Sequence, residues 1–340
     1  LFQRVEVLND LPNKSVQDLY QDRDGYLWVA TRNGLFRYDG YSLEGYKSTM
    51  HRPHLLTDNN VFCVEEDGSH RLWIGTKNGL SVLDKQTGVV RKYGNDRLNS
   101  GGVSALLVTR DNRVLVGTER GLYEYLEEED GFRRMDGSLS GGVFNAWTIK
   151  ALLEDDRGDV WIGTWSEGLY RQEKKTGRFF AYPRMNALNS AHVLFQDSRK
   201  RIWVGSWGYG LHLLHRPYEP ERVSWTTFAH RKEADASLSD NLVYAISEDK
   251  HTHTLWVGTR SALSLLPLDG KLTADAHFQN CYADGEERSI AGSEVAALLC
   301  DRQGLMWIGM IGGGVNKVDT RKSEFAYDPM SEVRQRFHSA

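Results

Sequence analysis

The chain has 340 residues, of which 40% are hydrophobic and 26% are charged, and its formal net charge is −4. This composition is typical of a globular protein and excludes disordered, collagen-like and coiled-coil chains. Without a surplus of positive charge the chain is not expected to bind nucleic acid, and no apolar run approaches the roughly 18–20 residues that a membrane helix needs.

The first predicted element is a short strand at residues 2–7, followed by a polar turn at residues 8–13. From residue 16 onward one pattern recurs seven times, with the core W-[VI]-G-T-x-x-G-L. Successive copies are 42 to 53 residues apart. Six copies begin with Trp and the third begins with Leu: Trp28, Trp73, Leu115, Trp161, Trp203, Trp256 and Trp307. Repeats of this length indicate an architecture built from identical structural units.

Each repeat is predicted to form four strands. An apolar first strand, expected to be buried on both faces, ends at an acidic or polar turn residue: Asp22, Asp67, Thr109, Asp155, Asp197, Asp249 and Asp301. The six aspartates are expected to cap nearby backbone amides. The second strand carries the Trp and an interior Gly, which marks the close approach of another backbone. The third strand begins at Gly-Leu, and the fourth resembles F-x-x-Y, as at residues 90–93, 179–182 and 325–327.

Four strands and their connections need roughly 42 residues, close to the observed period. The sequence therefore predicts an all-β fold, a seven-bladed β-propeller of four-stranded antiparallel blades. An open solenoid is the competing architecture. Because an open ring would leave an unpaired edge, we expect the N-terminal strand to close the ring by pairing with the last repeat near residues 315–318.

The closure predicts the domain boundaries. Residues 1–322 would form the propeller, and residues 323–340 would be a C-terminal extension that begins a second propeller or a linker. The strand predicted at residues 325–327 is then one more than seven blades require. In the alternative arrangement this strand completes blade seven and the N-terminal strand is surplus.

Turns between the second and third strands are expected to share one face of the ring. Four blades would place a cation there, and two would place aromatic side chains: Arg32, Lys77, Arg120, Arg260, Trp165, Trp207 and Tyr209. Aromatic rings stack on sugars and arginine binds carboxylates, so this rim is a candidate oligosaccharide site. Solvated hairpin turns and a protein interface are the alternatives for these rim residues.

The tryptophans of the repeated pattern are instead expected in the core, where they would be structural anchors: Trp28, Trp73, Trp161, Trp203, Trp256 and Trp307.

No catalytic or metal-binding motif was found in the sequence. It contains no H-E-x-x-H, G-x-S-x-G, Walker or EF-hand pattern, and His251 and His253 form the nearest approach to a histidine pair. Cys63, Cys281 and Cys300 have no C-x-x-C spacing and are expected to be free, inert thiols. We therefore predict no catalytic residue, no metal and no cofactor.

The combination of D-x-x-G-x-x-W with W-I-G-T-x-x-G-L, and the opening F-x-x-V-x-x-L-x-D-L-P-N-x-x-V, resembles the two-component regulator propeller family. The resemblance implies the periplasmic sensor of a hybrid two-component protein, as found in gut Bacteroides, which detects products of polysaccharide breakdown. It further implies a second propeller or a homodimer partner, and a parent protein with a membrane helix and a histidine kinase, often followed by a receiver and an AraC-type domain. Contact with the membrane would come only through that later part.

Two other functions remain open at this stage. Seven-bladed propellers with similar repeats include streptogramin lyases, and His192 and Glu294, assigned to blades four and seven, are candidates for their catalytic pair. The third function is a protein-interaction scaffold without a small ligand.

Overall fold

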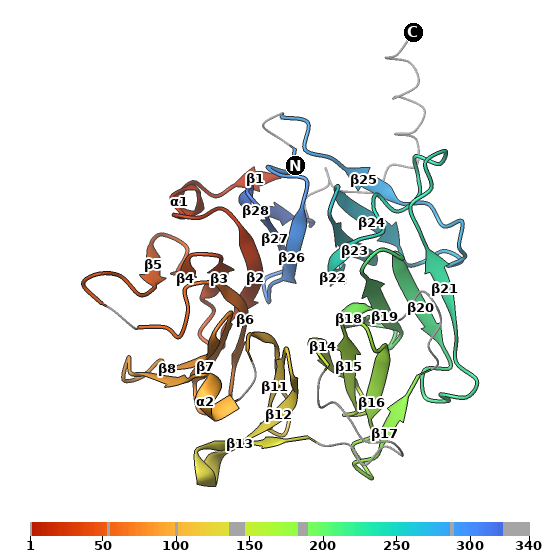
Figure 1. Cartoon of the computed structure of the whole chain (residues 1–340). Coiled ribbons are helices and arrows are strands. Elements are labelled where there is room, and N and C mark those ends of the chain that lie inside the picture. The colour runs from red at the N-terminus through yellow and green to blue at the C-terminus, as the bar shows by residue number, and fades with distance from the viewer. Residues whose placement is uncertain are drawn as a thin grey trace.

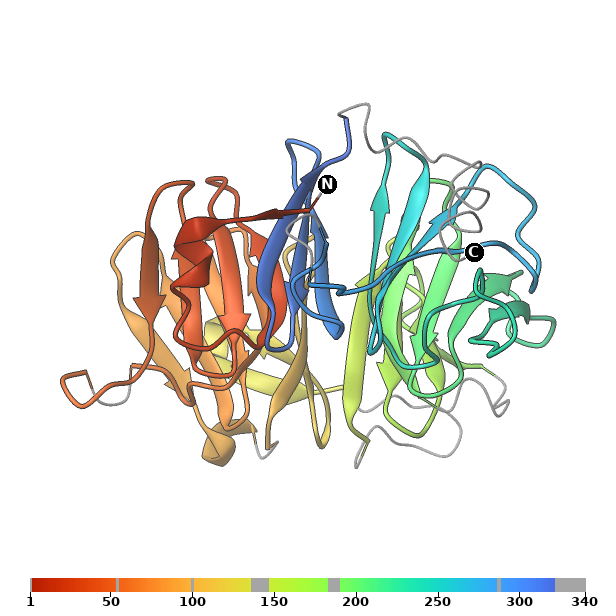
Figure 2. The ribbon, with the colours of Figure 1, turned by 90° about the horizontal axis from the view of Figure 1, so that it is seen from above.

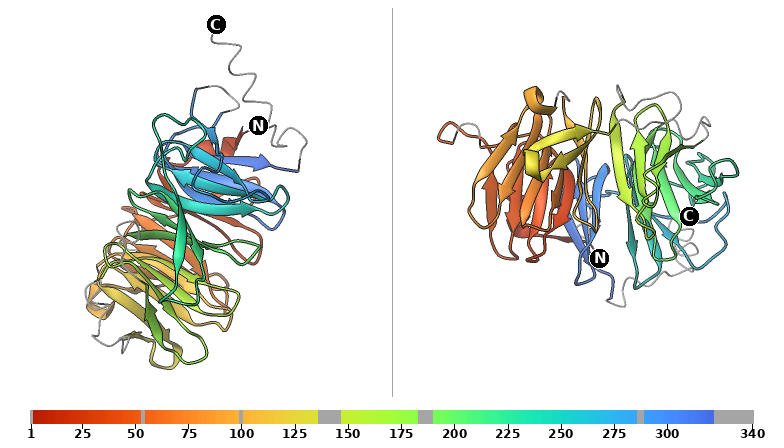
Figure 3. Two further views of the ribbon diagram at one scale, coloured as in Figure 1. Left: turned by 90° about the vertical axis from the view of Figure 1, so that its right-hand side faces the viewer. Right: turned by 90° about the horizontal axis from the view of Figure 1, so that it is seen from below.

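The computed structural model describes residues 2–52, 55–98, 101–135, 147–182, 190–285 and 289–321. In this part of the chain the strands form seven four-stranded antiparallel sheets that surround a common axis (Figure 1). In views turned by 90° from that of Figure 1, the sheets stand next to one another in a single layer (Figures 2 and 3). The predicted all-β, seven-bladed propeller is confirmed.

The blades follow the order of the repeats. Their innermost strands are β2 (Val16–Gln21), β6 (Val61–Glu66), β10 (Val103–Val108), β14 (Ile149–Glu154), β18 (Ala191–Gln196), β22 (Val243–Asp249) and β26 (Val295–Cys300). The second strands, which carry the repeated Trp, are β3 (Leu27–Thr31), β7 (Arg71–Thr76), β11 (Val114–Thr118), β15 (Val160–Thr164), β19 (Ile202–Ser206), β23 (Thr254–Thr259) and β27 (Leu305–Met310).

Outside these lie the third strands β4 (Gly34–Tyr38), β8 (Gly79–Asp84), β12 (Gly121–Leu126), β16 (Leu169–Gln172), β20 (Leu211–His215), β24 (Leu263–Pro267) and β28 (Gly314–Asp319). The outermost strands are β5 (Leu43–Tyr46), β9 (Val90–Tyr93), β13 (Gly131–Arg134), β17 (Phe179–Ala181), β21 (Ser224–Phe228), β25 (Gln279–Cys281) and β1 (Gln3–Arg4). Helices are limited to the short α1 (Glu6–Asn9), α2 (Asn95–Leu98) and 3-10 turn η1 (Glu127–Glu129), and none found in the described ranges is long and apolar enough to span a membrane.

The N-terminal strand closes the ring. In β1, Gln3 pairs with Lys317 and Arg4 pairs with Asn316, so β1 becomes the fourth strand of blade seven beside β28. The pairing partner is the predicted one, but the strand is only two residues long, because the chain turns into α1 at Glu6. The other predicted terminal strand, at residues 325–327, lies outside the described residues, as does the extension at 323–340.

Five of the repeated tryptophans are fixed by an aspartate that lies six residues earlier. The indole Nε1 donates to the carboxylate Oδ2 at 2.8 Å in each of these pairs: Asp22–Trp28, Asp67–Trp73, Asp155–Trp161, Asp197–Trp203 and Asp301–Trp307. The other oxygen, Oδ1, accepts backbone N–H groups of the turn, as from Gln303 and Leu305 to Asp301. One carboxylate thus caps the turn, as predicted, and also satisfies the buried indole.

Blade three replaces both members of this pair. Thr109 stands in place of the aspartate and Leu115 in place of the tryptophan, and Leu115 is fully buried. The Thr109 hydroxyl still accepts the backbone N–H of Arg113 at 2.9 Å, so the turn keeps its cap. Without an indole N–H to satisfy, no carboxylate is needed at this position.

The interior glycines lie where one blade meets the next. A Cβ on Gly163 would lie 2.4 Å from the Ala191 backbone oxygen, and one on Gly258 would lie 2.5 Å from the Val295 oxygen. This confirms the predicted close approach of another backbone. The innermost strands, expected to be buried on both faces, are only partly buried, with the pattern buried–intermediate–intermediate in β2. The second strands are the fully buried ones, because a sheet covers each side of them.

We expect Gly163→Ala to lower the free energy of unfolding by about 1–3 kcal/mol, because the added methyl would force blades four and five apart. Gly270→Ala is the matched control, since no atom lies within 4 Å of a Cβ at that position. The measurement is chemical denaturation of both variants. Equal stabilities would show that the blade junction yields to the extra volume.

Candidate ligand-binding site

The turns between second and third strands share one face of the ring, here called the top face. The antiparallel order of every blade places the first residues of the innermost strands on the same face. A hydroxyl of the W-[VI]-G-T pattern closes these turns, as where Thr76 Oγ1 donates to the Gly79 carbonyl at 2.9 Å. Gly79 has φ +115°, a conformation that favours glycine, which explains the Gly of the pattern.

Every innermost strand carries an irregularity at its second residue. The register between first and second strands shifts there in all seven blades, as between Val16 and Asp18 in β2. These shifts single out seven partly buried residues at the top of the ring: Gln17, Phe62, Ser104, Lys150, His192, Tyr244 and Ala296. A bulge reorients the side chain of a strand residue, and bulges are often found beside functional sites.

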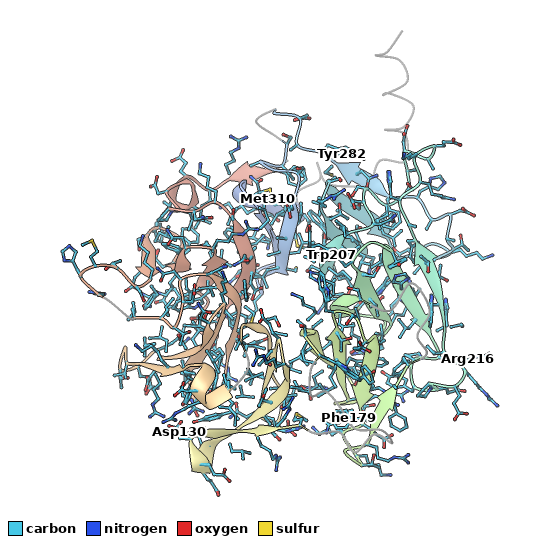
Figure 4. The ribbon with its side chains drawn as sticks, in the orientation of Figure 1. Asp130, Phe179, Trp207, Arg216, Tyr282 and Met310 are labelled. Atoms are coloured by element: carbon cyan, nitrogen blue, oxygen red, sulfur yellow. The ribbon has the colours of Figure 1, made fainter. Side chains whose placement is uncertain are left out.

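Two of these bulge residues join two turn residues in an aromatic cluster, which comprises Trp165, His192, Trp207 and Tyr244. The ring centroid of Trp207 lies 5.2 Å from that of Trp165, 5.1 Å from that of His192 and 5.4 Å from that of Tyr244. Trp165 and Trp207 remain 40% and 37% exposed. In Figure 4, Trp207 lies toward the centre of the ring, whereas Asp130 and Arg216 lie at its outer edge.

Burial shifts the pKa values of three side chains in and beside this cluster: His192, Lys150 and Tyr244. Burial, and then the charge of Lys150, lowers the pKa of His192 to about 4, so its imidazole is neutral at pH 7. Its Nδ1 is buried and has no hydrogen-bond partner among the described residues. Burial also lowers the pKa of Lys150, whose ammonium lies 5.2 Å from the Trp165 ring centroid. Burial and then the Glu294 charge raise the pKa of Tyr244 to about 12.

The structure brings only part of the predicted rim together. Trp165 and Trp207 are in ring contact, and Tyr209 is 47% exposed on the same turn as Trp207. Arg260 is exposed, and its Nε lies 3.3 Å from Asp240 Oδ2. The other cations, Arg32, Lys77 and Arg120, are exposed on turns of blades one to three, and no side-chain contact joins them to the aromatic cluster in the described residues. The six repeated tryptophans are buried, with exposed fractions of 0–6%.

Sequence reasoning missed Lys150 and Tyr244 and misplaced His192. His192 lies in β18, which precedes the fifth anchor Trp203, so it belongs to blade five and not to blade four. A usable signal was present, because the residue after the first buried position of the innermost strand is Lys in blade four, His in blade five and Tyr in blade six. Its neighbours on both sides are apolar in these three strands.

Two acidic side chains lie on innermost strands away from the aromatic cluster. Asp18 accepts the backbone N–H of Val64 at 3.0 Å and that of Leu19 at 2.9 Å. Burial raises the pKa of Asp18 to about 7. Burial and then the charge of Asp18 raise the pKa of Glu65 to about 8. The folded protein therefore holds protons that the unfolded chain releases between about pH 4.5 and pH 8.

Because a raised carboxyl pKa makes stability fall as pH rises through that window, we expect Glu65→Gln to flatten the pH dependence of unfolding. The variant should be more stable than the parent by about 1–2 kcal/mol at pH 8.5 and nearly equal to it at pH 4. Denaturation at both pH values measures this difference. A variant that is less stable at pH 8.5 would show that the Glu65 carboxylate is stabilised when ionised.

One group of potential metal ligands exists in the described residues, on the opposite face. Asp24, Glu66 and His70 bring their ligand atoms within 4.8 Å of one another. The Lys85 ammonium lies 2.7 Å from both Asp24 and Glu66 and 2.9 Å from Asp22. We therefore interpret this group as an ion-pair network centred on Lys85. The three cysteines are free.

Comparison with known families fits the repeat geometry. Four segments of the chain, residues 10–33, 55–78, 142–166 and 237–261, match the two component regulator propeller. All four segments contain the innermost strand of a blade and its Trp strand, and the first three also contain a hydrogen-bonded Asp–Trp pair. These repeats belong to the two component regulator propeller family. The predicted family is confirmed.

Relatives of the regulator propeller are longer than this chain. A protein named histidine kinase P4 from Formosa agariphila is 25% identical over 196 residues, which are 54% of this chain and 14% of that protein. The extracellular domain of a hybrid two component system from B. thetaiotaomicron superposes with a TM-score of 0.76 at 21% identity, over 93% of this chain and 41% of that domain. The chain therefore spans less than half of each of these two proteins.

The same fold also occurs in an enzyme. Virginiamycin B lyase from Staphylococcus aureus superposes with a TM-score of 0.66 at 12% identity, over 89% of this chain and 94% of the lyase. At these identities the structural likenesses establish the shared propeller fold and nothing further about activity.

Proposed function

We propose that this regulator propeller is the extracytoplasmic ligand-sensing domain of a two-component signalling protein, which binds an oligosaccharide and transmits its binding to a histidine kinase. The matched family and the relative named as a histidine kinase support the signalling role. The B. thetaiotaomicron neighbour, an extracellular domain, supports a position outside the cytoplasm, which in a protein anchored in the inner membrane is the periplasm.

The observation that carries ligand binding is the aromatic cluster. Two indoles from adjacent blades, Trp165 and Trp207, stand in contact and are more than one-third exposed at the top face. Exposed aromatic faces stack on the apolar faces of sugar rings, and large side chains of this kind are otherwise buried. Neutral His192 and Tyr244 add hydrogen-bonding groups beside them.

A lyase is the second candidate, because His192 belongs to the aromatic cluster and Glu294 borders it. Glu294 interacts with Tyr244, whose ring centroid lies 6.0 Å from that of His192. A pKa of about 4 makes His192 a weak general base at neutral pH. Turnover of virginiamycin B that is lost in His192→Ala would favour the lyase. An interaction scaffold would show neither turnover nor sugar binding.

The test has two parts. Isothermal titration of this chain and of the longest available ectodomain with neutral and acidic oligosaccharides should give saturable binding to at least one class. Reading the coding sequence beyond Ala340 should then reveal further repeats, a membrane helix and a histidine kinase. Absence of all sugar binding from the full ectodomain would overturn the ligand assignment, and a gene without a kinase would overturn the signalling role.

A further inference from the structure

Lys150 is a cation beside the aromatic cluster that forms no ion pair among the described residues. It is the bulge residue of β14, partly buried, and its ammonium faces the Trp165 ring at 5.2 Å. No ion pair or hydrogen bond of its side chain was found among the described residues. Its side chain interacts electrostatically with Glu119, Cys63 and His192, and burial lowers its pKa although Glu119 and Cys63 raise it.

The other cations of the top face differ from Lys150. Arg260 already has a carboxylate, since its Nε lies 3.3 Å from Asp240. Arg32, Lys77 and Arg120 are exposed, so water solvates their charges at little cost. Lys150 is instead partly buried, with its ammonium 5.2 Å from the centroid of the Trp165 ring. A charge that has lost part of its water is costly unless it is paired, and a ligand with a negative group would supply that pair.

The position of Lys150 also fixes where such a group would lie. The Lys150 ammonium lies 5.2 Å from the centroid of the Trp165 ring, and that centroid lies 5.2 Å from the centroid of the Trp207 ring. The distance from the charge to the nearer stacking surface is therefore about the width of one sugar ring. The buried Nδ1 atom of His192, which has no hydrogen-bond partner among the described residues, lies on the same side of the ring, in blade five next to blade four. We propose that the cluster binds an acidic oligosaccharide, with a sugar ring against Trp165 and Trp207 and its anionic group on Lys150.

This inference rests on the proposed function and narrows it to acidic sugars. The anion is a carboxylate, as in a uronic acid, or a sulfate ester, and a lysine ammonium binds either one as a point charge that donates hydrogen bonds. Neutral oligosaccharides would stack on the same indoles but would leave Lys150 unpaired. The bound state therefore discriminates by charge, because only an anionic ligand neutralises the desolvated cation.

The test uses this chain and its longer ectodomain with matched probes. The probes are trimers of galacturonate, mannuronate and guluronate, the methyl ester of each, a sulfated galactose trimer and neutral galactotriose. We expect titration to detect an anionic trimer, with at least about tenfold weaker binding after methyl esterification or in Lys150→Met. Lys150→Arg should retain binding, and exposed Lys250→Ala on the opposite face should leave it unchanged.

A pH series tests the charge of Lys150 directly, because a residue that only supported the fold would not make anion binding depend on pH in this way. Since burial lowers the Lys150 pKa, anion binding should weaken as pH rises through that value in the parent but not in Lys150→Arg, whose guanidinium stays protonated. A carboxylate or a sulfate response identifies the source of the charge. Equal binding of neutral and anionic trimers, or unchanged binding in Lys150→Met, would overturn the inference and leave the proposed function standing. Absence of binding to every sugar would overturn both.

Discussion

Asp155→Ala should lower the free energy of unfolding by about 3–5 kcal/mol. Its carboxylate accepts four hydrogen bonds: Oδ1 from the N–H groups of Arg157 at 2.9 Å and Asp159 at 3.0 Å, and Oδ2 from the Trp161 indole at 2.8 Å and the Tyr218 hydroxyl at 3.0 Å. Tyr218 belongs to the loop after β20, so one side chain links blade five to blade four. Removing it leaves a fully buried indole N–H without an acceptor.

Thr109→Ala is the control for this prediction, because blade three has the same turn but no indole to satisfy. Its cost should be about 1 kcal/mol, the value of an ordinary turn hydrogen bond. Asp155→Asn should fall between the two, since the amide oxygen can still cap the turn while its NH2 group opposes the indole N–H. Chemical denaturation of all three variants measures the differences. Similar losses for Asp155→Ala and Thr109→Ala would show that the indole bond contributes little.

Trp207→Ala should weaken oligosaccharide binding by about 100-fold while leaving the fold intact. Trp207 is the centre of the aromatic cluster, because its ring contacts Trp165, His192 and Tyr244. Truncation would remove the stacking surface and separate the remaining rings. As the side chain is 37% exposed, the stability of the blade should change far less than the affinity.

Titration of the variants with the oligosaccharide bound by the parent measures this effect. Trp207→Phe should keep part of the affinity, because a smaller aromatic face remains. Tyr41→Ala is the control, since Tyr41 is 90% exposed on the opposite face, in the turn between β4 and β5. Affinity that survives Trp207→Ala within twofold would place the sugar elsewhere on the protein, and circular dichroism checks that the blades remain folded.

The fold could be predicted from the sequence because its determinants recur. Every blade needs the same turn, the same anchor and the same narrow junction, so six tryptophans and their aspartates repeat at nearly constant spacing. The function of the aspartate was only half predicted. Capping of the turn follows from neighbouring residues, whereas the hydrogen bond that the Trp161 indole donates to the Asp155 carboxylate depends on how two strands pair.

The candidate site could be predicted only in part, because its residues differ from blade to blade and do not belong to the repeated pattern. Trp165 and Trp207 could be identified as unusual turn residues. Lys150 and Tyr244 lie at bulges, and a bulge is a feature of strand pairing that one strand's sequence does not reveal. The four rim cations shared a turn position, but an equivalent position in seven blades places residues around a ring rather than together.

Closure by β1 has a consequence for the order in which the blades form. The other six blades are each made of contiguous strands, so each can form without a distant part of the chain. Gln3, in contrast, pairs with Lys317, so the strand that precedes blade one must wait for blade seven. Until β1 pairs with it, β28 has no strand on its outer side, and until blade seven forms, blade one has no neighbouring blade on one side. The seventh blade is therefore the step at which an unfinished ring is open to pairing with another chain.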